Sequence, residues 1–446
     1  MPSLNRQEIA GHFAEIHPPF TQQAALAEAN RCLFCFDAPC TIACPTHIDV
    51  PGFIKKISTA NLRGSALTIL DSNILGLSCS RVCPVEVLCE GSCVLHRYNQ
   101  RPIEIGRLQR HAMDHFYDTG AKLPVRNRKP RMRSIACVGA GPASLACAAE
   151  LARRGYSVTV FDSRPYAGGL NTYGVAEYKL RPDDSLKEVE LVHSLGVTFE
   201  LNTEVGVSVP LETLEQVYDL IFLGLGLGPT ESLGLKGVGV KGVVDALTLI
   251  ADYKTAGNIQ IGRRVAVIGG GNTAIDAACA AARLGAEEVL ILYRRGRDQM
   301  PAFEFEFERA QSDGVRFHWL TVARSVKTGG DGRVTALECV RMDLGASDAS
   351  GRRAPTAIAG SEFLLECDMV IPSIGQTRLV EFLSRCRNVE LRDGCVVTDP
   401  HTGRTTNPMF YAGGDCVNGG LEVVDAAAGG KRAAIAMAAH LEEQHG

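Results

Sequence analysis

The pattern of apolar and polar positions along the chain changes near residue 134. Before it, apolar residues recur at helical spacing, as in the stretch PGFIKKISTANLRGSALTIL from Pro51 to Leu70. From Ser134 onward, short apolar runs of strand length alternate with glycine-rich turns and helical stretches, which is typical of parallel α/β units. This succession occurs twice, first from Ile135 and again from Arg264. The pattern predicts a helical N-terminal region followed by an α/β fold with two similar units.

The order of the runs also predicts how the two α/β units follow one another. Strand-like runs return after Glu362, and the chain closes on an Ala-rich helix from about Val424, so one unit is expected to interrupt the other. The basic, Pro-containing segment from Lys122 to Arg133 is expected to be a solvated linker rather than a binding patch. The predicted domains are a helical domain, a discontinuous α/β domain and an inserted α/β domain, at residues 1–121, 134–247 with 371–446, and 248–370.

Composition and charge narrow the class of protein. The 446 residues are 46% hydrophobic and 22% charged, which are ordinary values for a soluble globular protein. The formal net charge of −4 gives no support to nucleic acid or an anionic membrane as the main partner. No apolar run approaches the roughly 20 residues of a membrane span, and the N-terminus lacks the basic start and apolar centre of a signal peptide. We expect a cytoplasmic protein.

The first glycine-rich turn has the features of a dinucleotide site. It joins the strand Ile135–Val138 to a helix, so that backbone amides and the helix N-terminus can face a pyrophosphate. Ser144 stands where a third glycine is usual and is expected to crowd the helix slightly against the strand. Asp162 ends the next strand and is placed to accept a hydrogen bond from a ribose hydroxyl. The candidate residues of the turn are Gly139, Gly141, Pro142, Ala143 and Ser144.

A second segment, near the C-terminus, indicates FAD as the occupant of this site. The run Tyr411–Asp415, YAGGD, resembles the flavoprotein motif in which an aspartate at the end of a strand hydrogen-bonds a ribityl hydroxyl. The helix that starts near Val424–Ala426 would direct its positive end at the flavin ring, where it could stabilise reduced, anionic flavin. Gly414, Asp415 and Ala426 are therefore further candidate FAD residues.

The second glycine-rich turn predicts a nicotinamide dinucleotide site. It follows the strand Val265–Ile268 and ends in alanine, at a position where the pattern accepts Gly or Ala. The next strand, Val289–Tyr293, is followed by two arginines where an NAD site usually places an acid, which favours the 2′-phosphate of NADPH over NADH. The alternative, two solvated arginines after a strand, stays open. The candidate residues are Gly269, Gly271, Asn272, Thr273, Ala274, Arg294 and Arg295.

Eight of the 16 cysteines lie between Cys32 and Cys93, in the runs C-x2-C-x4-C-x3-C-P and C-x3-C-P-x4-C-x3-C. In a reducing compartment this density favours metal binding over disulfides. Thiolates suit iron–sulfur clusters or zinc, and the short spacings let one loop wrap three corners of a cubane cluster. Zinc has no redox chemistry. Next to a flavin, the pattern therefore predicts two [4Fe–4S] clusters rather than structural zinc or a disulfide framework.

The stretches RCLFCFDAPCTIACPTHIDVPGFI and GLSCSRVCPVEVLCEGSCV, together with the two turns, give the chain a family resemblance over its whole length. It resembles the NAD(P)H-oxidising part of dihydropyrimidine dehydrogenase, which in bacteria is a separate subunit. It is also similar to the small subunit of glutamate synthase. Two details favour the dihydropyrimidine branch: the five residues between Cys83 and Cys89, and the segment Ile105–Gln109, in which that branch uses a glutamine as a cluster ligand.

The resemblance implies ligand sets that spacing alone leaves open. It makes Cys79 a spare, whereas spacing alone would make Cys79 the eighth ligand. It also marks Gly169 and Leu170 as neighbours of the flavin, although Asn171-Thr172 replace the apolar or basic residues usual at the next positions. The implied ligands are Cys32, Cys35, Cys40 and Cys93 for one cluster, and Cys44, Cys83, Cys89 and Gln109 for the other.

The fold and function implied by the resemblance are those of an electron relay. An iron–sulfur domain would precede two Rossmann-like domains, with the NAD(P) domain inserted in the FAD domain. NAD(P)H would reduce FAD, and the clusters would pass electrons to a partner subunit that contains FMN and iron–sulfur clusters and reduces uracil or thymine, in a hetero-oligomer. This half-reaction requires no general acid or base, and we nominate no catalytic residue. The alternatives are a glutamate-synthase-type subunit that feeds another reductase, and a non-enzymatic iron–sulfur redox sensor, against which two complete phosphate loops argue.

Overall fold

The computed structural model describes residues 8, 11–124, 130–234, 239–255, 259–347 and 353–443, so residues 125–129 of the expected linker lie outside the described residues. The chain divides into two compact units. Unit 1 comprises Met1–Ala14, Tyr173–Tyr178 and Gly228–Thr377, and unit 2 comprises Glu15–Thr172, Lys179–Leu227 and Arg378–Gly446. The predicted fold, in which one α/β domain interrupts the other, is confirmed.

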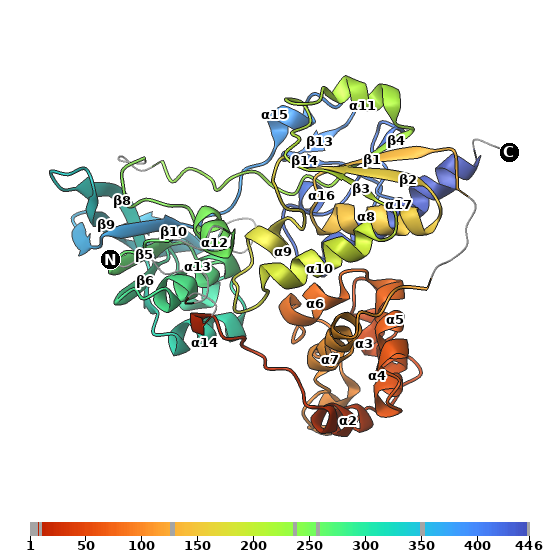
Figure 1. Ribbon diagram of the computed structural model, residues 1–446. Coiled ribbons are helices and arrows are strands. Elements are labelled where there is room, and N and C mark those ends of the chain that lie inside the picture. Colours follow the sequence, from red (N-terminus) through yellow and green to blue (C-terminus); the bar gives the residue numbers. More distant parts are fainter. Residues whose placement is uncertain are drawn as a thin grey trace. The chain divides into compact units, whose positions relative to one another are not determined.

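The N-terminal part of unit 2 is helical, as its periodicity predicts (Figure 1). Thr21, Asp49 and Asn61 cap three of the helices by accepting hydrogen bonds from backbone amides three residues ahead. The apolar faces of the helices bury Phe53 and Phe116 in a common core. The elements are α2 (Gln22–Asn30), α3 (Pro39–Ile42), α4 (Val50–Ser58), α5 (Leu62–Ser72), α6 (Gly76–Val82), η1 (Val94–Tyr98) and α7 (Ile105–Asp118).

The rest of unit 2 is built on a parallel five-stranded sheet with the order β15-β4-β1-β2-β3. Ile135 and Cys137 of β1 face the core beneath α8 and α17, whereas Ala136 and Val138 face the core beneath α11. The elements are β1 (Ser134–Val138), α8 (Pro142–Arg153), β2 (Ser157–Phe161), α9 (Leu170–Tyr173), α10 (Pro182–His193), β3 (Thr198–Glu200), α11 (Leu211–Val217), β4 (Leu220–Leu223), α15 (Val380–Leu383), β13 (Leu391–Arg392), β14 (Cys395–Val396), β15 (Phe410–Ala412), α16 (Asp415–Asn418) and α17 (Val423–Glu443).

Unit 1 contains a parallel sheet with the order β12-β5-β6-β7 and a separate antiparallel sheet in which β9 pairs with β8, β10 and β11. The parallel sheet carries the second glycine-rich turn at the end of β5. The elements are α12 (Ala246–Thr255), β5 (Arg264–Ile268), α13 (Asn272–Arg283), β6 (Glu288–Leu292), η2 (Arg297–Gln299), α14 (Glu304–Ser312), β7 (Arg316–His318), β8 (Thr321–Thr328), β9 (Val334–Ser347), β10 (Arg353–Ala357), β11 (Phe363–Glu366) and β12 (Met369–Pro372).

Unit 1 extends beyond the inserted domain expected at residues 248–370. Its long segment runs from Gly228 to Thr377, and a backbone hydrogen bond joins the two ends of this segment, since Gly228 N donates to Thr377 O at 2.8 Å. The N-terminal segment belongs to it as well, because Phe13 is fully buried and stacks on Tyr253 with the ring centroids 4.8 Å apart. A single aromatic residue gives no periodic signal, so the apolar pattern could not assign this segment to the inserted domain.

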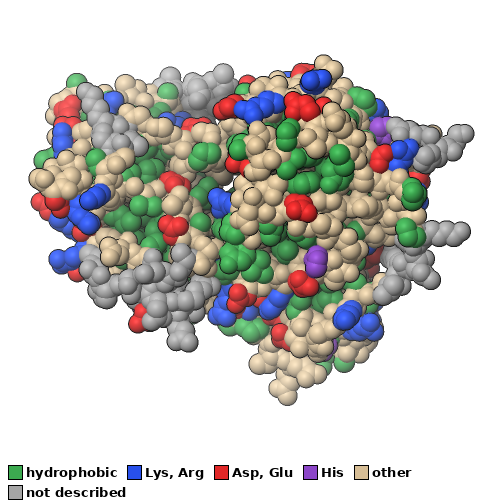
Figure 2. Space-filling model, turned by 45° about the horizontal axis from the view of Figure 1, so that its top comes forward, with side chains coloured by type: hydrophobic (Ala, Val, Ile, Leu, Met, Phe, Trp, Pro, Cys, Tyr) green, Lys and Arg blue, Asp and Glu red, His purple; other side chains and the backbone are tan. Residues whose placement is uncertain are grey.

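Charged side chains of both signs are intermingled on the face drawn in Figure 2, and neither sign forms a continuous patch there. This agrees with the small formal net charge of −4. Among the helices of the described residues, none combines the length and the apolar character that crossing a membrane requires.

Candidate functional site

The first glycine-rich turn begins α8 and leaves open space before the helix. Gly139 has a φ of +91°, and a Cβ on it would lie 2.5 Å from Gly224 O, so both the turn and the close approach require glycine. Gly141 is the N-cap of α8. Among the described atoms, only Gly169 Cα would lie within 4 Å of a Cβ added to Gly141, at 3.9 Å. Pro142 at the first helical position has no amide to satisfy. The space beyond Gly141 suits a phosphate at the helix N-terminus.

Three candidate FAD residues from separate segments meet beside this turn. A Cβ on Gly414 would lie 3.0 Å from Ala143 Cβ and 3.5 Å from Ala426 Cβ. The helices α17 and α8 can approach here because Gly430 has no side chain, and a Cβ on it would lie 1.9 Å from Ala143 O. The first turn of α8 is thereby packed closely on α17. Their positive ends suit a ligand that carries a pyrophosphate and a ring that becomes anionic on reduction.

The two candidate aspartates differ in their surroundings. Asp162 accepts hydrogen bonds from Ala140 N at 2.7 Å and from Arg164 N at 2.8 Å, so it holds the glycine-rich turn in shape. An ionised carboxylate has about four acceptor sites, which leaves capacity for a ribose hydroxyl. Asp415 begins α16, where burial raises its pKa, and Leu421 N lies 3.4 Å from its Oδ1. The ribose and ribityl roles of these aspartates stay predictions.

The two departures from the family pattern, at Ser144 and at Thr172, are each accommodated by neighbouring residues. Ser144 Oγ lies where a Cβ of Gly224 would be, 2.1 Å away, so the crowding expected from Ser144 is relieved by that glycine. The hydroxyl is buried and has no hydrogen-bond partner among the described residues. Thr172 Oγ1 donates to Ala167 O at 2.7 Å and lies 2.8 Å from Ser185 Oγ of α10. Thr172 therefore ties the preceding Gly-Gly-Leu segment to α10.

In the second glycine-rich turn, between β5 and α13, the first two glycines pack closely against neighbouring protein atoms. A Cβ on Gly269 would lie 2.1 Å from Ser373 O, and one on Gly270 would lie 2.5 Å from the Tyr293 ring. Gly271, the N-cap of α13, has no described atom within 4 Å of the Cβ position. As at the first turn, the open side of the helix N-terminus suits a pyrophosphate.

The segment after η2 lies against this second turn. Asn272 Oδ1 accepts from Phe303 N at 3.1 Å, and Ala302 N donates to a backbone carbonyl of the turn at 3.2 Å. Asn272 therefore fixes the start of α13 through its side chain. Thr273 is exposed and Ala274 is fully buried, so Thr273 can reach a ligand while Ala274 packs the helix on the sheet.

The two arginines after β6 have different surroundings. Arg294 is exposed, whereas Arg295 is half-buried and its Nε donates to Arg353 O at 3.2 Å. Arg297 adds a third guanidinium that the motif did not identify, and it lies 3.9 Å from the centroid of the Phe307 ring. Arg294 is thus an exposed cation at the end of β6, where a 2′-phosphate would be bound. This role stays a prediction.

The first implied cysteine set surrounds one apolar cavity, which is lined by Cys32, Cys35, Cys40 and Cys93 together with Val50, Ile54 and Ile103. The loop between Cys32 and Cys40 contains two sharp turns, at Phe34 with a φ of +51° and Ala38 with a φ of +37°. Burial and then the neighbouring Cys32 raise the pKa of Cys40 to about 12. Because cluster ligands are thiolates, the positive charge of an iron core would compensate the cost of burying them. The residues therefore fit the implied cluster.

The three thiols of the second implied set, which comprises Cys44, Cys83, Cys89 and Gln109, lie close together, and the Cys79 thiol joins them as a fourth. A hydrogen bond with the Cys79 thiol and then burial raise the pKa of Cys83, and Cys89 and Cys44 also lie close enough to raise it. Within the described residues, no three His, Cys, Asp or Glu side chains are close enough to share a single metal ion.

The fourth ligand of this set has two candidates. Asn73 Nδ2 donates to Cys79 Sγ at 3.2 Å, so the Cys79 sulfur is oriented by a buried amide. Gln109 is also buried, and its Nε2 donates to Gly76 O at 2.8 Å, at the first residue of α6. The structure therefore brings Cys79 to the other thiols and holds Gln109 by its nitrogen. The choice of Gln109 stays a prediction from the resemblance.

Comparison with known proteins gives the family of the chain. Residues 9–121 match the family described as dihydropyrimidine dehydrogenase domain II, 4Fe–4S cluster, and residues 133–430 match the pyridine nucleotide-disulphide oxidoreductases. The small chain of NADPH glutamate synthase from Escherichia coli (strain K12) is 36% identical over 438 residues, which cover 95% of this chain and 92% of that protein. The β subunit of NADP(+)-dependent formate dehydrogenase from Moorella thermoacetica is 36% identical over 431 residues, which cover 91% of this chain and 60% of that longer protein.

A solved structure agrees with the fold. FprA from Mycobacterium tuberculosis, in complex with NADPH, has a TM-score of 0.58 and 21% sequence identity, over 70% of this chain and 86% of that chain. At this identity the likeness concerns the fold alone.

These comparisons confirm an iron–sulfur domain followed by an NAD(P)-dependent oxidoreductase domain, with FAD, [4Fe–4S] clusters and NAD(P)H as cofactors. They do not single out the dihydropyrimidine branch that the cysteine spacing favours, since a relative that is similar along the full chain is a glutamate synthase small chain. The chain belongs to the pyridine nucleotide-disulphide oxidoreductase family, within the group that includes the small chain of glutamate synthase.

Proposed function

We propose that this chain is the electron-input subunit of a larger oxidoreductase, which oxidises NADPH at FAD and delivers the electrons through two [4Fe–4S] clusters to a partner subunit. The observation that carries this proposal is that the candidate flavin residues and both cysteine sets belong to one compact unit. Both relatives described above are named as chains of larger enzymes that use NADPH or NADP(+). The exposed Arg294 after β6 agrees with that choice of cofactor.

The chain's own residues contribute mainly binding and orientation. Bound FAD supplies the hydride chemistry and links a two-electron donor to one-electron clusters. Gly141 and Gly271 leave space for the two pyrophosphates, and the N-termini of α8 and α13 direct positive partial charge at them. Asp162 holds the first turn through Ala140 N. Since correct positioning alone can lower a barrier by several kcal/mol, no side chain needs to act as acid or base.

We further propose that the partner subunit binds at the loop of the first cysteine set. Leu33 and Phe36 in this loop are 54% and 107% exposed, and Ile42 is 68% exposed. Large apolar side chains that gather in the open beside a redox centre are typical of a protein-binding surface. Cys35 and the other cysteines of this set would hold a cluster close to this surface, and that cluster would supply the redox chemistry for transfer to a partner. The proposed assembly is a hetero-oligomer.

A second candidate is the pyrimidine-reducing assembly, whose partner would contain FMN and iron–sulfur clusters and reduce uracil or thymine. It is supported by the match of residues 9–121 to a dihydropyrimidine dehydrogenase domain and by the five residues between Cys83 and Cys89. The full-length similarity to the glutamate synthase small chain favours a glutamate-synthase-type input subunit, so the pyrimidine assembly comes second.

The test is to tag the chain in its native host, purify it anaerobically, and identify the protein that accompanies it. We expect FAD and iron in the preparation, faster oxidation of NADPH than of NADH with an artificial acceptor, and no reduction of uracil by the chain alone. A large amidotransferase partner would establish the glutamate synthase type, and an FMN-containing pyrimidine reductase would establish the second candidate. A preparation without FAD would contradict both and revive the redox sensor.

A further inference from the structure

A continuous set of polar contacts runs from the flavin segment, through α10, to the helix α6 that carries Cys79. We propose that α10 is a positioning element, and that Asp184 and Glu188 on it hold the second cysteine set at a fixed place relative to the flavin site. The proposal rests on the electron relay described above and deepens it, because it names residues that act through the position of α6 rather than as ligands.

Glu188 caps the N-terminus of α6. Its Oε1 accepts hydrogen bonds from Leu77 N at 2.8 Å and Ser78 N at 3.0 Å, and its Oε2 accepts from Ser78 Oγ. Glu188 and Leu77 are 111 residues apart in the sequence, and Glu188 is 1% exposed. Burial raises the pKa of Glu188 to about 7, against the lowering effect of these hydrogen bonds. A carboxyl group that is buried at such a cost requires hydrogen-bond partners for its oxygens, and both oxygens of Glu188 have them.

A second contact follows one turn away on both helices. Arg81 Nε of α6 lies 3.4 Å from Asp184 Oδ2 of α10, and the Arg81 side chain is 6% exposed. Asp184 and Glu188 are four residues apart, so they lie on the same face of α10. Two contacts on one face fix both the distance and the rotation of α6, which a single contact could not do.

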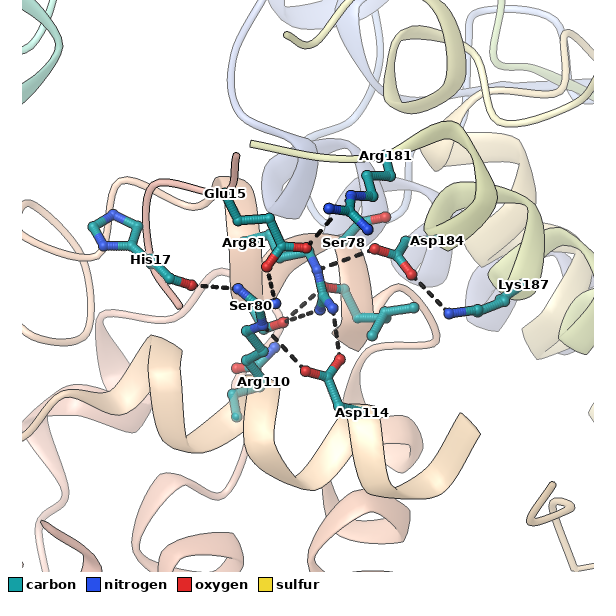
Figure 3. Close-up of polar contacts among 12 residues, drawn as sticks. Glu15, His17, Ser78, Ser80, Arg81, Arg110, Asp114, Arg181, Asp184 and Lys187 are labelled. Carbon is teal, nitrogen blue, oxygen red and sulfur yellow. Dashed lines mark hydrogen bonds and ion pairs between the residues drawn. The ribbon is translucent and has the colours of Figure 1, made fainter. Parts of the chain in front are cut away.

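The same arginine is anchored to the neighbouring helix α7. Figure 3 shows Arg81 between Asp184 of α10 and Asp114 of α7, and its Nη2 lies 2.6 Å from Asp114 Oδ1. Arg110 Nε approaches the other oxygen of Asp114 at 3.1 Å, and Arg110 also pairs with Glu15. Arg81 Nε has no hydrogen-bond partner among the described residues, so its contact with Asp184 is an ion pair alone, whereas Arg81 Nη2 and Arg110 Nε hydrogen-bond to the two oxygens of Asp114. Buried charges of this kind must be paired, and such pairs contribute a defined geometry more than they contribute stability.

At its other side α10 is bound to the flavin segment. Ser185, next to Asp184, has its hydroxyl 2.8 Å from Thr172 Oγ1. A Cβ on Gly168 would lie 2.1 Å from Thr172 Oγ1 and 2.6 Å from Ser185 Oγ, so this pair of hydroxyls packs directly on the glycines near the flavin. Thr172, which departs from the family pattern, thereby gains a role as the flavin-side end of the link.

The position of α6 matters for either choice of fourth ligand. Cys79 lies within α6, and Cys83 is its C-cap. Gln109 is tied to the same helix through Gly76 O. A shift of α6 would therefore move Cys79 and Cys83 relative to the other members of the second set and would disturb the hydrogen bond that holds Gln109.

The experiment separates the flavin step from the cluster step in the whole protein. The double variant D184A/E188A is compared with Glu188→Gln, which keeps an oxygen that can accept from Leu77 N and Ser78 N, and with Glu190→Ala as a control, since the Glu190 side chain is 79% exposed on the same helix. After anaerobic mixing with NADPH, flavin reduction is followed by absorbance and cluster reduction by electron paramagnetic resonance of rapidly frozen samples. We expect the double variant to reduce flavin within about twofold of the normal rate and its clusters about tenfold more slowly. The glutamine and control variants should behave as the unchanged protein.

A second readout does not depend on activity. In hydrogen exchange, the Leu77 and Ser78 amides should exchange at least about tenfold faster in Glu188→Ala than in Glu188→Gln, because only the alanine variant removes their acceptor. The proposal would be overturned if the double variant reduced its clusters at the normal rate. It would also be overturned if flavin reduction in that variant slowed as much as cluster reduction. If the double variant loses iron, Asp184→Asn decides in its place, and an unchanged rate of cluster reduction there would overturn it. If the unchanged protein reduces no cluster with NADPH, the proposed function fails, while the exchange data still report on the link.

Discussion

The two glycine-rich turns share a backbone plan and differ in the residue that follows the neighbouring strand. Each places a glycine at the N-cap of a helix with open space before it, Gly141 in one and Gly271 in the other. The first turn is held by Asp162, whose carboxylate accepts from a turn amide. In the second, the ring of Tyr293 packs on the turn and the exposed Arg294 follows. The turn therefore sets the place of a pyrophosphate, and the residue after the next strand decides what else can be bound there.

The largest effects are expected from filling the open space at each turn. Gly141→Ala fits the described protein, so its added methyl group should displace the phosphate and reduce the FAD content about tenfold or more. The matched variant Gly271→Ala should keep FAD and lower kcat/KM for NADPH about a hundredfold. The flavin absorbance and the rate with an artificial acceptor check both. A Gly141→Ala protein that retains FAD would contradict the placement of the pyrophosphate.

A glycine on the protein side of the turn should affect folding instead of binding. Gly269→Ala would bring a Cβ within 2.1 Å of Ser373 O at a φ of +150°, so the variant should lose about 3 kcal/mol or more of unfolding free energy. Gly271→Ala serves as the control and should lose less than about 1 kcal/mol. Thermal unfolding of the two variants checks this difference. Equal midpoints would show that the tight packing behind the second turn is not required.

The charge after the second strand should decide between the two nicotinamide cofactors. Arg294→Ser should raise KM for NADPH about tenfold, which corresponds to about 1.4 kcal/mol, and leave KM for NADH nearly unchanged. Arg295→Ser should have a smaller effect, because Arg295 is engaged with the Arg353 carbonyl. Steady-state kinetics with NADPH and with NADH measures the two KM values and their ratio in each variant. The same change for NADPH and NADH would remove Arg294 from the 2′-phosphate site.

The smallest effect on stability is expected at Ser144 of α8 and Ala274 of α13, where each helix packs on its sheet. Ser144 occupies in the first turn the place that Ala274 occupies in the second, and its buried hydroxyl has no hydrogen-bond partner among the described residues. Ser144→Ala should therefore stabilise the protein by about 1 kcal/mol and leave the FAD content unchanged, whereas Ala274→Ser should destabilise it by a similar amount. Denaturant unfolding monitors both. A loss of FAD in Ser144→Ala would instead give the hydroxyl a role in binding the cofactor.

The turns are the part of the molecule that local sequence predicts well. Their glycines, strands and helices follow one another within a few residues, and the strands β1 and β5 begin at Ser134 and Arg264, one residue before the predicted starts. The first cysteine set is similar, since three of its four members lie close together in the sequence, between Cys32 and Cys40. Such features need no knowledge of long-range contacts.

Contacts between distant segments could not be predicted in this way. The burial of Phe13 in unit 1 and the capping of α6 by Glu188 join residues that are far apart in sequence, and no periodic pattern marks either side chain. The branch of the family depends on a different kind of signal. The dihydropyrimidine branch is indicated only by the spacing of Cys83 and Cys89 and by Gln109, whereas the similarity of the whole chain to the glutamate synthase small chain draws on every domain.

The central claim is that electrons from NADPH pass through FAD to the iron–sulfur clusters of this chain. Anaerobic titration of the purified protein with NADPH, followed by visible absorbance and electron paramagnetic resonance, tests it most directly. The account predicts loss of the oxidised flavin absorbance and the appearance of a reduced [4Fe–4S] signal without any partner present. Clusters that stay oxidised with NADPH while a strong chemical reductant reduces them, or a protein that contains no flavin, would contradict it.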